Sequence, residues 1–241
     1  MLRILVTGHL GLIGSRLIPL LDEHEVIGLD RIDGNDILTC DLPDVDLVYH
    51  LAARTNVVDS MKDPLSDARD NVLGTVRIAE HYKNTKVIYT ASAASIDPQS
   101  PYGISKLAGE YYIKTTVPNY VILRFPNIFD KDAKQGLIPA VLNNDTVKVY
   151  GDGSQMRDYV HASDAAKGLL LAKDWECGEY ALSSGRGTST GDIARATGKP
   201  IEWLPARTGE KQESLLELRA PGWLPTIDVI EYVRRYSHTR V

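Results

Sequence analysis

The glycine-rich turn near the N-terminus limits the fold of this chain more than any other feature. The apolar run Arg3–Thr7 (RILVT) is typical of a buried strand, and three glycines follow it: Gly8, Gly11 and Gly14. A glycine triplet between a strand and a helix lets backbone N–H groups approach a pyrophosphate, and the start of the helix adds partial positive charge. The pattern predicts a strand–turn–helix unit that binds a dinucleotide. The alternative is a tight structural turn that binds nothing.

An acidic residue at the end of the next apolar run indicates which dinucleotide fits. The run EVIGLD ends in Asp30, about 20 residues beyond the glycines, where a carboxylate accepts hydrogen bonds from the adenosine ribose hydroxyls. The same carboxylate repels a 2′-phosphate, so the sequence favours NAD over NADP. The neighbouring Arg31 is the feature that favours NADP.

The first half of the chain alternates strand-like and helical patterns. Helical patterns over 12–23, over 64–83 and around Tyr102 separate the strand-like runs RILVT, EVIGLD, LVYHLAA, KVIYTAS and YVILRF. This alternation predicts an α/β fold with a Rossmann-type, doubly wound parallel sheet. Beyond residue 128 the strand-like runs TVKVYG, EYALSS and PIEWLP are shorter and mixed with helices and turns, which predicts a small C-terminal α/β lobe.

The boundaries expected for these two parts are as follows. A Rossmann domain that binds NAD covers 1–127, and the segment from about 157 to 173 returns to it. The smaller lobe covers 128–156 and 174–241. One link is short, because only residues 43–46 separate ILTCDL from LVYHLAA, whereas a parallel crossover needs roughly a dozen residues. We expect either a degenerate third strand or a direct route without a helix, and in both cases a trimmed sheet edge.

Bulk composition excludes several classes of function. The 241 residues carry a net charge of −5 with no basic tract, which argues against nucleic-acid binding. Two cysteines, Cys40 and Cys177, are too few and too far apart for a disulfide framework. Apolar runs fall far short of the ~20 residues that span a bilayer, and the first residues leave no room for a signal peptide. We expect a cytoplasmic protein without a membrane segment, and no cluster has the spacing of metal ligands.

The stretch SPYGISKLAGE places Tyr102 one helical turn before Lys106, so both side chains share a face. A free phenol, with a pKa of about 10, is a poor base at neutral pH. An ammonium at about 5 Å, at an effective dielectric of about 20, favours the phenolate by roughly 3 kcal/mol and lowers the phenol pKa by about two. The positive charge of an oxidised nicotinamide adds to this effect. The alternative is an ordinary solvated helix face.

Glycines spaced Gly-x-x-Gly-x-x-Gly, together with Tyr102-x-x-x-Lys106, resemble the extended short-chain dehydrogenase/reductase family. The likeness is closest to nucleotide-sugar 4-epimerases of the UDP-glucose 4-epimerase type. It extends through HLAARTNV, NVLGT, YGDGSQMRDYVHASD, PARTGEKQES and PGWLPT. The resemblance implies an NAD-dependent isomerase that inverts C4 of a UDP-hexose. In such enzymes the tyrosine takes the proton of the 4-hydroxyl while hydride leaves C4 for NAD, and the 4-keto sugar turns before hydride returns.

The resemblance also implies a set of site residues. The catalytic residues are Tyr102, Lys106 and Ser92, whose hydroxyl hydrogen-bonds the 4-oxygen. The cofactor contacts are Gly8, Gly11, Leu12, Ile13, Gly14, Asp30, Asp41, Leu42, Leu51, Ala52, Ala53, Thr55, Asn71, Tyr102, Lys106 and Phe125. The substrate contacts are Ser92, Asn127, Tyr150, Arg157, Arg207 and Ser214. Arginine suits a diphosphate because its fork engages phosphate oxygens bidentately, and the alternative for both arginines is a surface salt bridge.

Two positions narrow the reaction by the same resemblance. Family members that dehydrate sugars carry Asp-Glu just after the active-site hydroxyl, where this chain has Ala93-Ala94, and alanine transfers no proton. Ser214 matches a residue beside C2 of the sugar, where a small side chain admits an N-acetyl group. UDP-N-acetylglucosamine and UDP-N-acetylgalactosamine are therefore expected alongside the plain sugars. Where the family often reads Val-Tyr-Gly this chain has Ser95-Ile96-Asp97, and its shorter length implies trimmed pocket loops.

Other interpretations stay open. The first is a reductase that reduces a nucleotide 4-keto sugar with exchangeable NAD(P)H, and the second is a non-catalytic NAD-binding sensor on the same scaffold. Relatives dimerise through helices that correspond to 64–83 and 102–114, which implies a homodimer. We expect His50 and His161 to pack or hydrogen-bond, and Asp158 and Asp164 to be structural.

Overall fold

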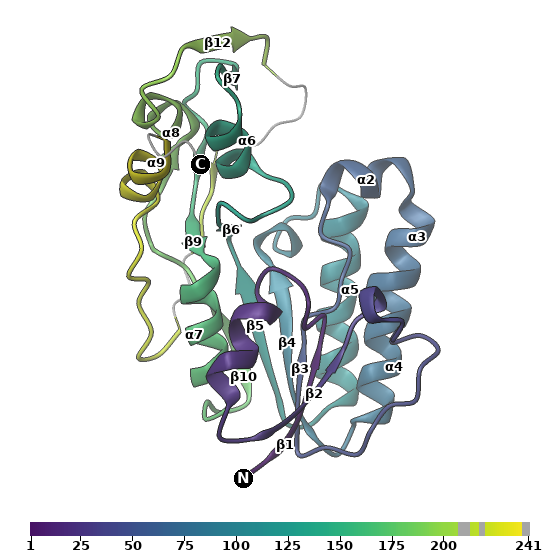
Figure 1. The fold of residues 1–241 in the computed structure, drawn as a ribbon. Coiled ribbons are helices and arrows are strands. Elements are labelled where there is room, and N and C mark those ends of the chain that lie inside the picture. Colours follow the sequence, from purple (N-terminus) through teal and green to yellow (C-terminus); the bar gives the residue numbers. More distant parts are fainter. Residues whose placement is uncertain (207–212, 217–219, 238–241) are drawn as a thin grey trace. The chain divides into compact units, whose positions relative to one another are not determined.

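The computed structural model describes residues 1–206, 213–216 and 220–237 (Figure 1). The chain forms two compact units. The first unit comprises Met1–Arg124 with Ala166–Tyr180, and the second comprises Phe125–Ala165 with Ala181–Val241.

The first unit is built on a six-stranded sheet with the order β10-β5-β4-β3-β1-β2. Strand β1 pairs in parallel with β2 and with β3, and β3 pairs in parallel with β4. This arrangement confirms the predicted doubly wound α/β fold. The strands are β1 (Arg3–Thr7), β2 (Glu25–Leu29), β3 (Leu47–His50), β4 (Lys86–Ser92), β5 (Tyr120–Phe125) and β10 (Gly178–Ala181). Because β10 comes from the run EYALSS, the sheet extends beyond the return segment expected over 157–173.

Strand register brings the carboxyl ends of three strands to one edge. Thr7 lies opposite both Leu29 and His50, so the turns that follow β1, β2 and β3 begin side by side. The chain runs from β1 to β2 on one side and then to β3 on the other. This reversal is the topological switch point at which doubly wound sheets bind ligands.

Helices cover both faces of this sheet. Helices α3, α4 and α5 lie on one face, and α1 lies on the other with the part of α7 (Ala162–Ala172) that belongs to the first unit (Figure 1). The elements of the first face are α2 (Val57–Lys62), α3 (Pro64–Ala68), the π-helical turn η3 (Arg69–Leu73), α4 (Gly74–His81) and α5 (Pro101–Thr116). The side chains of Asn56, Asp63 and Ser100 cap α2, α3 and α5, as N-cap residues do.

The first helix differs from the prediction. A single helix was expected over 12–23, whereas α1 covers only Gly14–Leu17 and continues as the 3-10 turn η1 (Ile18–Leu21). Pro19 explains the change, because its nitrogen carries no hydrogen for the α-helical ladder and its ring crowds the preceding turn.

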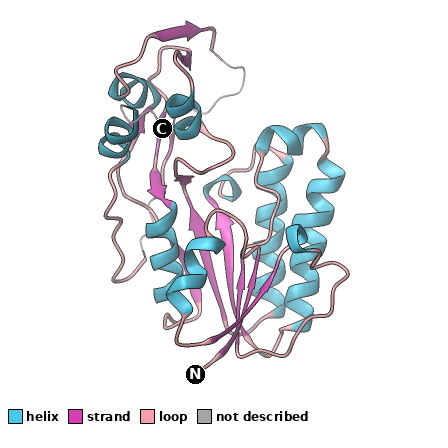
Figure 2. Ribbon diagram, in the orientation of Figure 1, coloured by secondary structure: helices cyan, strands magenta, loops and turns pink. Residues whose placement is uncertain are grey.

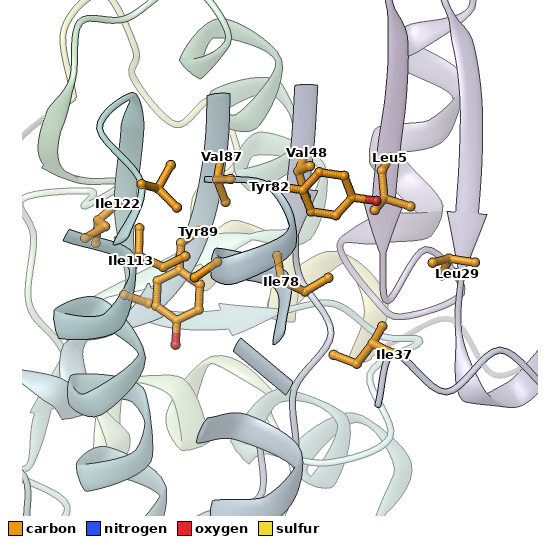
Figure 3. Close-up of a cluster of buried hydrophobic side chains, with 13 residues drawn as sticks. Leu5, Leu29, Ile37, Val48, Ile78, Tyr82, Val87, Tyr89, Ile113 and Ile122 are labelled. Carbon is orange, nitrogen blue, oxygen red and sulfur yellow. The ribbon is translucent and has the colours of Figure 1, made fainter. Parts of the chain in front are cut away.

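The core of the first unit lies between the sheet and the helices α4 and α5 (Figure 3). Val48 and Val87 from the strands meet Ile78 from α4 and Ile113 from α5, and all four are essentially inaccessible to water. Neighbouring strands whose side chains are buried on both faces read as continuous apolar runs, which is why LVYH and KVIYTAS lack alternation.

The short link before β3 takes the expected irregular form. Between β2 and β3 the chain makes only the 3-10 turn η2 (Arg31–Asp33) and no strand, so β2 remains the edge of the sheet. Arg77 on α4 donates hydrogen bonds to the carbonyl oxygens of Ile37 and Cys40. These bonds fasten the segment to the helix layer in place of a strand ladder.

The second unit consists of small sheets and short helices (Figure 2). Its sheets are β6 (Asn127–Phe129) with β9 (Tyr159–His161), β7 (Val147–Tyr150) with β12 (Ile201–Leu204), and β8 (Met156–Arg157) between β11 (Thr188–Ser189) and β13 (Glu213–Ser214). Its helices include α6 (Leu137–Asn143), α8 (Thr190–Ala196) and α9 (Val229–Ser237). Phe129, Val149 and Val233 are part of its own buried core.

Buried acidic residues fasten the loops of the second unit. Asp158 accepts hydrogen bonds from Ser183 Oγ (2.6 Å) and from the Ser184 backbone. Asp164 accepts from the backbone N–H groups of Thr226 (2.7 Å) and Ile227 (2.9 Å). His161 lies 3.2 Å from Asp130 in the same unit. These contacts give Asp158, Asp164 and His161 the structural roles predicted for them.

Among the described residues, no helix combines the length and apolar character needed to cross a membrane. Cys40 is half-buried and Cys177 is exposed, and both are free thiols.

Candidate active site

The glycine-rich turn leads from β1 into α1 and lies against the chain that follows β3. Gly8 has a φ of 71°, and a Cβ atom there would lie 2.8 Å from the backbone nitrogen of Ala52, so only glycine fits. Gly11 N–H donates to the Gly8 carbonyl (3.0 Å). Within the described chain, the N–H groups of Leu12 and Ile13 have no protein acceptor. They are free donors at the place where a pyrophosphate is expected.

Asp30 follows β2 and is largely buried, with 9% exposure. Its Oδ2 accepts from Leu10 N–H (3.2 Å) and its Oδ1 from Ile32 N–H (3.0 Å), so the carboxylate is oriented by the glycine turn on one side and η2 on the other. Each carboxylate oxygen can accept a further hydrogen bond, and ribose hydroxyls suit that capacity. Arg31 points to a different partner, Asp70 of η3, at 2.9 Å.

His50 joins the glycine turn to the helix layer. Its Nδ1 lies 2.8 Å from Thr7 Oγ1, and its Nε2 lies 3.1 Å from Thr75 Oγ1. Thr7 also accepts from Ala52 N–H (3.1 Å). His50 therefore has the hydrogen-bonding role expected for it, and it orients Leu51, Ala52 and Ala53, the residues predicted to contact the cofactor. Neither Thr7 nor Thr75 was predicted as a site residue, although Thr7 ends the run RILVT and Thr75 ends the motif NVLGT.

Asn71 lies inside the π-helical turn η3 and closes the other side of the segment after β3. Its Oδ1 accepts from Arg54 N–H (2.7 Å) and its Nδ2 donates to the Arg54 carbonyl (3.0 Å). The same Nδ2 lies 3.0 Å from Ser105 Oγ on α5. A π turn inside an α-helix frequently marks a functional site, and here it turns the amide toward both segments. Thr55, the next predicted contact, is exposed.

Ser92 ends β4, and the 3-10 turn η4 (Ala93–Ser95) follows it. Ser92 Oγ accepts from Ala94 N–H (3.2 Å), and its interaction with Tyr102 lowers the pKa of that phenol. Gly103 makes this approach possible, because a Cβ there would lie 2.6 Å from the Ala94 carbonyl oxygen. The structure thus brings together Ser92 and Tyr102, two of the three predicted catalytic residues, from separate elements.

Lys106, the third, is buried under Tyr102 on the same helix. Its Nζ lies 4.4 Å from the ring centroid of Tyr89, a cation–π contact, and the residue is only 3% exposed. Burial lowers the pKa of Lys106 to about 7, against the opposing charges of Glu110 and Asp67.

Tyr102 differs from the expectation that its lysine neighbour lowers its pKa. Burial raises the pKa of Tyr102, the hydrogen bond with Ser92 lowers it, and the charge of Asp67 raises it further. The net pKa stays above the ordinary value because burial is the largest of these effects and removes the phenolate from water.

Glu110 was not identified as a site residue, although it closes the quoted stretch. It is inaccessible to water, and its carboxylate accepts from Ser95 Oγ (2.5 Å) and from Arg124 Nε (3.0 Å). The bond to Ser95 ties η4, which follows Ser92, to α5. The sequence could have indicated Glu110 through its spacing, because Glu110 lies one helical turn after Lys106 and shares its face of the helix.

The remaining predicted cofactor contacts lie in three places. Asp41 is exposed and Leu42 half-buried in the segment before β3, and Phe125 is the buried last residue of β5.

Four of the predicted substrate contacts lie in the second unit. Arg157 on β8 pairs with Ser214 on β13, so these two are neighbours although 57 positions separate them in the sequence. Asn127 begins β6, and its Nδ2 donates to the Asp158 carbonyl (3.2 Å). Tyr150 ends β7 and is half-buried. Arg207 lies outside the described residues. No group of His, Cys, Asp and Glu in the described part of the chain is suited to hold a metal ion.

Comparison with known proteins identifies the family. The model of the NAD dependent epimerase/dehydratase family matches residues 4–179. A putative UDP-glucose 4-epimerase of Methanocaldococcus jannaschii is 32% identical over 96% of this chain and 96% of its own length. The UDP-N-acetylglucosamine 4-epimerase from Methanobrevibacter ruminantium M1, in complex with UDP-N-acetylmuramic acid, superposes with a TM-score of 0.84 at 25% identity, covering 98% of this chain and 97% of that one. MoeE5 in complex with UDP-glucose and NAD also superposes with a TM-score of 0.84 at 25% identity, covering 98% of this chain and 97% of that one. The chain belongs to the NAD-dependent epimerase/dehydratase family of nucleotide-sugar enzymes.

Proposed function

We propose that this enzyme is a 4-epimerase that inverts C4 of a UDP-hexose through a 4-keto intermediate. The observation that carries the proposal is the arrangement of Ser92, Tyr102 and Lys106, in which the serine interacts with the tyrosine and the lysine lies buried one turn further along α5. The residues that follow Ser92 are Ala93 and Ala94, which can neither donate nor accept a side-chain proton. An elimination needs such a group, whereas inversion through a ketone does not.

The residues of the first unit fit NAD. The free N–H groups of Leu12 and Ile13 suit the pyrophosphate, and Asp30 suits the adenosine ribose. When bound, NAD supplies the hydride acceptor and donor for oxidation and reduction at C4. Leu51, Ala52 and Ala53 directly follow β3, at the switch point where doubly wound sheets bind dinucleotides.

Proton movement in this proposal belongs to Tyr102. Its Oη takes the proton of the 4-hydroxyl and later returns it, while Ser92 Oγ hydrogen-bonds the same oxygen. Because burial raises the pKa of Tyr102, the phenolate needs more positive charge than Lys106 provides alone. A cationic nicotinamide next to the phenol supplies it, so the base is strong only when the cofactor is oxidised.

The nucleotide sugar is assigned to residues of the second unit. Arg157, with Arg207, is proposed to bind the diphosphate, and Asn127 and Tyr150 to line the nucleotide end. Ser214 is small and lies beside Arg157 in the sheet, which supports room for an N-acetyl group. UDP-N-acetylglucosamine and UDP-N-acetylgalactosamine are therefore proposed substrates together with UDP-glucose and UDP-galactose.

Detection of bound NAD and of a new epimer tests the proposal. The protein is purified without added cofactor, a portion is denatured and assayed for released NAD, and the rest is incubated with each UDP sugar. We expect an epimer peak by chromatography. In Tyr102→Phe the rate should fall by at least about 100-fold, since general-base catalysis contributes that much. Tyr111→Phe, an exposed tyrosine on the same helix, is the matched control and should retain the rate.

Two further outcomes decide between related functions. A reductase would consume added NADH or NADPH in proportion to product, whereas a 4-epimerase forms product without net consumption. Ser214→Tyr should abolish turnover of the N-acetyl sugars and spare that of UDP-glucose. Unchanged N-acetyl turnover in that variant contradicts the assignment of Ser214.

A further inference from the structure

Asp67, on α3, is a buried carboxylate that the reaction described so far does not use. Its exposure is 1%. Oδ1 accepts a hydrogen bond from Asn71 Nδ2 (3.2 Å), whereas Oδ2 is buried without a hydrogen-bond partner among the described residues. A buried acceptor without a donor lowers stability. Such groups in native proteins commonly serve a catalytic or binding role.

The position of Asp67 points to the face of α5 that carries the tyrosine and the lysine. Asn71 Nδ2, which donates to Asp67, also lies 3.0 Å from Ser105 Oγ. Ser105 immediately precedes Lys106, and its hydroxyl donates to the Tyr102 carbonyl (2.9 Å). The Asn71 amide nitrogen, which shares two hydrogens among three acceptors, therefore lies between the carboxylate of Asp67 and the turn of α5 that joins Tyr102 to Lys106.

The other charged and titratable groups around this pair are already engaged. Glu110, one turn further along α5, is bound by Arg124 and Ser95. His50 from β3 is held between two threonines, and its pKa is lowered to about 3 by burial and by the charge of Lys106. Tyr89 from β4 lies beneath Lys106, and burial raises its pKa. Among the described residues, Asp67 is thus the carboxylate near the pair that no cation neutralises by a direct contact.

We propose that Asp67 is a positioning residue for the acid–base pair, and that its unneutralised carboxylate holds the proton on Lys106 and delays the loss of the proton from Tyr102. The inference rests on the proposed function and adds to it a group from outside α5. The charge of Asp67 raises the pKa of both residues, although burial has the larger effect on each.

The consequence is a specific change in the pH dependence of turnover. The two limbs of the profile report formation of the phenolate of Tyr102 and loss of the ammonium of Lys106. Removal of the negative charge of Asp67 makes both groups more acidic. Both limbs should therefore move toward lower pH together, whereas a structural defect lowers the rate and leaves the limbs in place.

The test compares Asp67→Asn with Asp59→Asn, which removes the same charge from an exposed position on α2. All proteins are saturated with NAD. Turnover of UDP-glucose is measured from pH 5 to 10, and the lysine side chains are titrated by NMR, with the Lys106 resonance assigned from its loss in Lys106→Met. We expect both limbs and the NMR midpoint of Lys106 to fall by roughly one pH unit in Asp67→Asn. Asp59→Asn should match the unmodified protein.

Unmoved limbs, or an unmoved Lys106 midpoint, in a folded Asp67→Asn protein overturn the inference. If Asp67→Asn fails to fold by circular dichroism, Asp67→Ser takes its place, because serine can still hydrogen-bond Asn71 without a charge. The NMR titration separates this inference from the proposed function. A protein that turns over no UDP sugar but shows the shift of Lys106 refutes the 4-epimerase and keeps the role of Asp67.

Discussion

His50 can be assigned as a neutral side chain with its proton on Nε2. The Thr75 hydroxyl donates to the Asn71 carbonyl (2.6 Å), so it accepts from His50 Nε2. The Thr7 hydroxyl accepts from Ala52 N–H, so it is free to donate to His50 Nδ1. A second proton on the ring would require the Thr7 hydroxyl to turn its hydrogen away from Nδ1 and to accept there as well as from Ala52 N–H. Together with burial, which lowers the pKa of His50 to about 3, this favours the neutral imidazole.

The first prediction follows from that neutrality. The unfolded chain binds a proton at His50 below about pH 6.5, whereas the folded chain does so only near pH 3, so stability falls as pH decreases between these values. The slope should reach about 1 kcal/mol per pH unit. Urea unfolding at pH 7, 6 and 5 measures it. His50→Asn should lower stability at pH 7 but flatten the slope, whereas His81→Asn, at an exposed position, should keep it. Equal slopes in all three proteins contradict the assignment.

The sequence predicts the side chains that react, but it does not predict the neighbouring residues that change the pKa values of those side chains. Tyr102 and Lys106 could be recognised because one helical turn separates them and the glycine motif precedes them, and Ser92 through the family resemblance. Asp67 lies 35 positions before Tyr102, and nothing in its neighbours indicates that α3 and α5 are packed together there. The raised pKa of Tyr102 was also missed, because burial can be quantified only in the folded chain.

Among the elements, the turn after β2 and the π turn η3 together determine how Arg31 can be used. Arg31 stands next to Asp30, where a guanidinium could bind the 2′-phosphate of NADP. Asp70 in η3 instead holds Arg31 at 2.9 Å and Arg54 at 3.5 Å. The Arg31 side chain is 52% exposed, so the ion pair is worth at most about 1 kcal/mol. The ion pair is strong enough to reduce the availability of Arg31 to a 2′-phosphate, and therefore to favour NAD over NADP. It is also weak enough for one substitution to release Arg31.

The second prediction is that Asp70→Asn improves the binding of NADP. Release of Arg31 should lower the Kd for NADP by about fivefold, an effect of about 1 kcal/mol, and leave the Kd for NAD nearly unchanged. Fluorescence titration of cofactor-depleted protein measures both constants. The double variant Asp70→Asn, Arg31→Ala should lose the gain, because the arginine is what contacts the phosphate. A gain that persists without Arg31 would falsify the explanation.

The elements also show where sequence patterns stop being informative. Alternation of strand and helix predicted the sheet, and the short link over 43–46 predicted its trimmed edge. The single helix expected over 12–23 followed the apolar periodicity and took no account of Pro19, which divides the segment into α1 and η1. The pairing of Arg157 with Ser214 could not be predicted from spacing, since β8 and β13 have two residues each, too few to show a period.

For the whole molecule, the helix layer of the first unit leaves apolar side chains in water. The exposed large residues of α2, α3, η3 and α5 are Val57, Val58, Met61, Leu65, Leu73, Ile104, Tyr111 and Tyr112, and Leu65 is 79% exposed. Helices α3 and α4 both pack against α5, so these side chains belong to one layer. Large apolar side chains left exposed in one helix layer are typical of a protein–protein interface. We propose that a second copy of the chain covers it, in agreement with the homodimer expected for 64–83 and 102–114.

The last prediction tests this homodimer. In light scattering after size-exclusion chromatography the protein should have twice the chain mass of 26.6 kDa. The double variant Leu65→Glu, Tyr111→Glu should run as a monomer, because a stable interface of roughly 1,000 Å² or more does not tolerate like charges near its centre. Leu224→Lys changes a residue of the second unit that is 72% exposed and should leave the dimer intact. A monomeric unmodified protein, or a double variant that still dimerises, contradicts the proposal. Since α5 carries Tyr111 on its exposed face and Lys106 and Glu110 on its buried face, a folded monomer would also show whether the active-site helix needs a partner to hold its position.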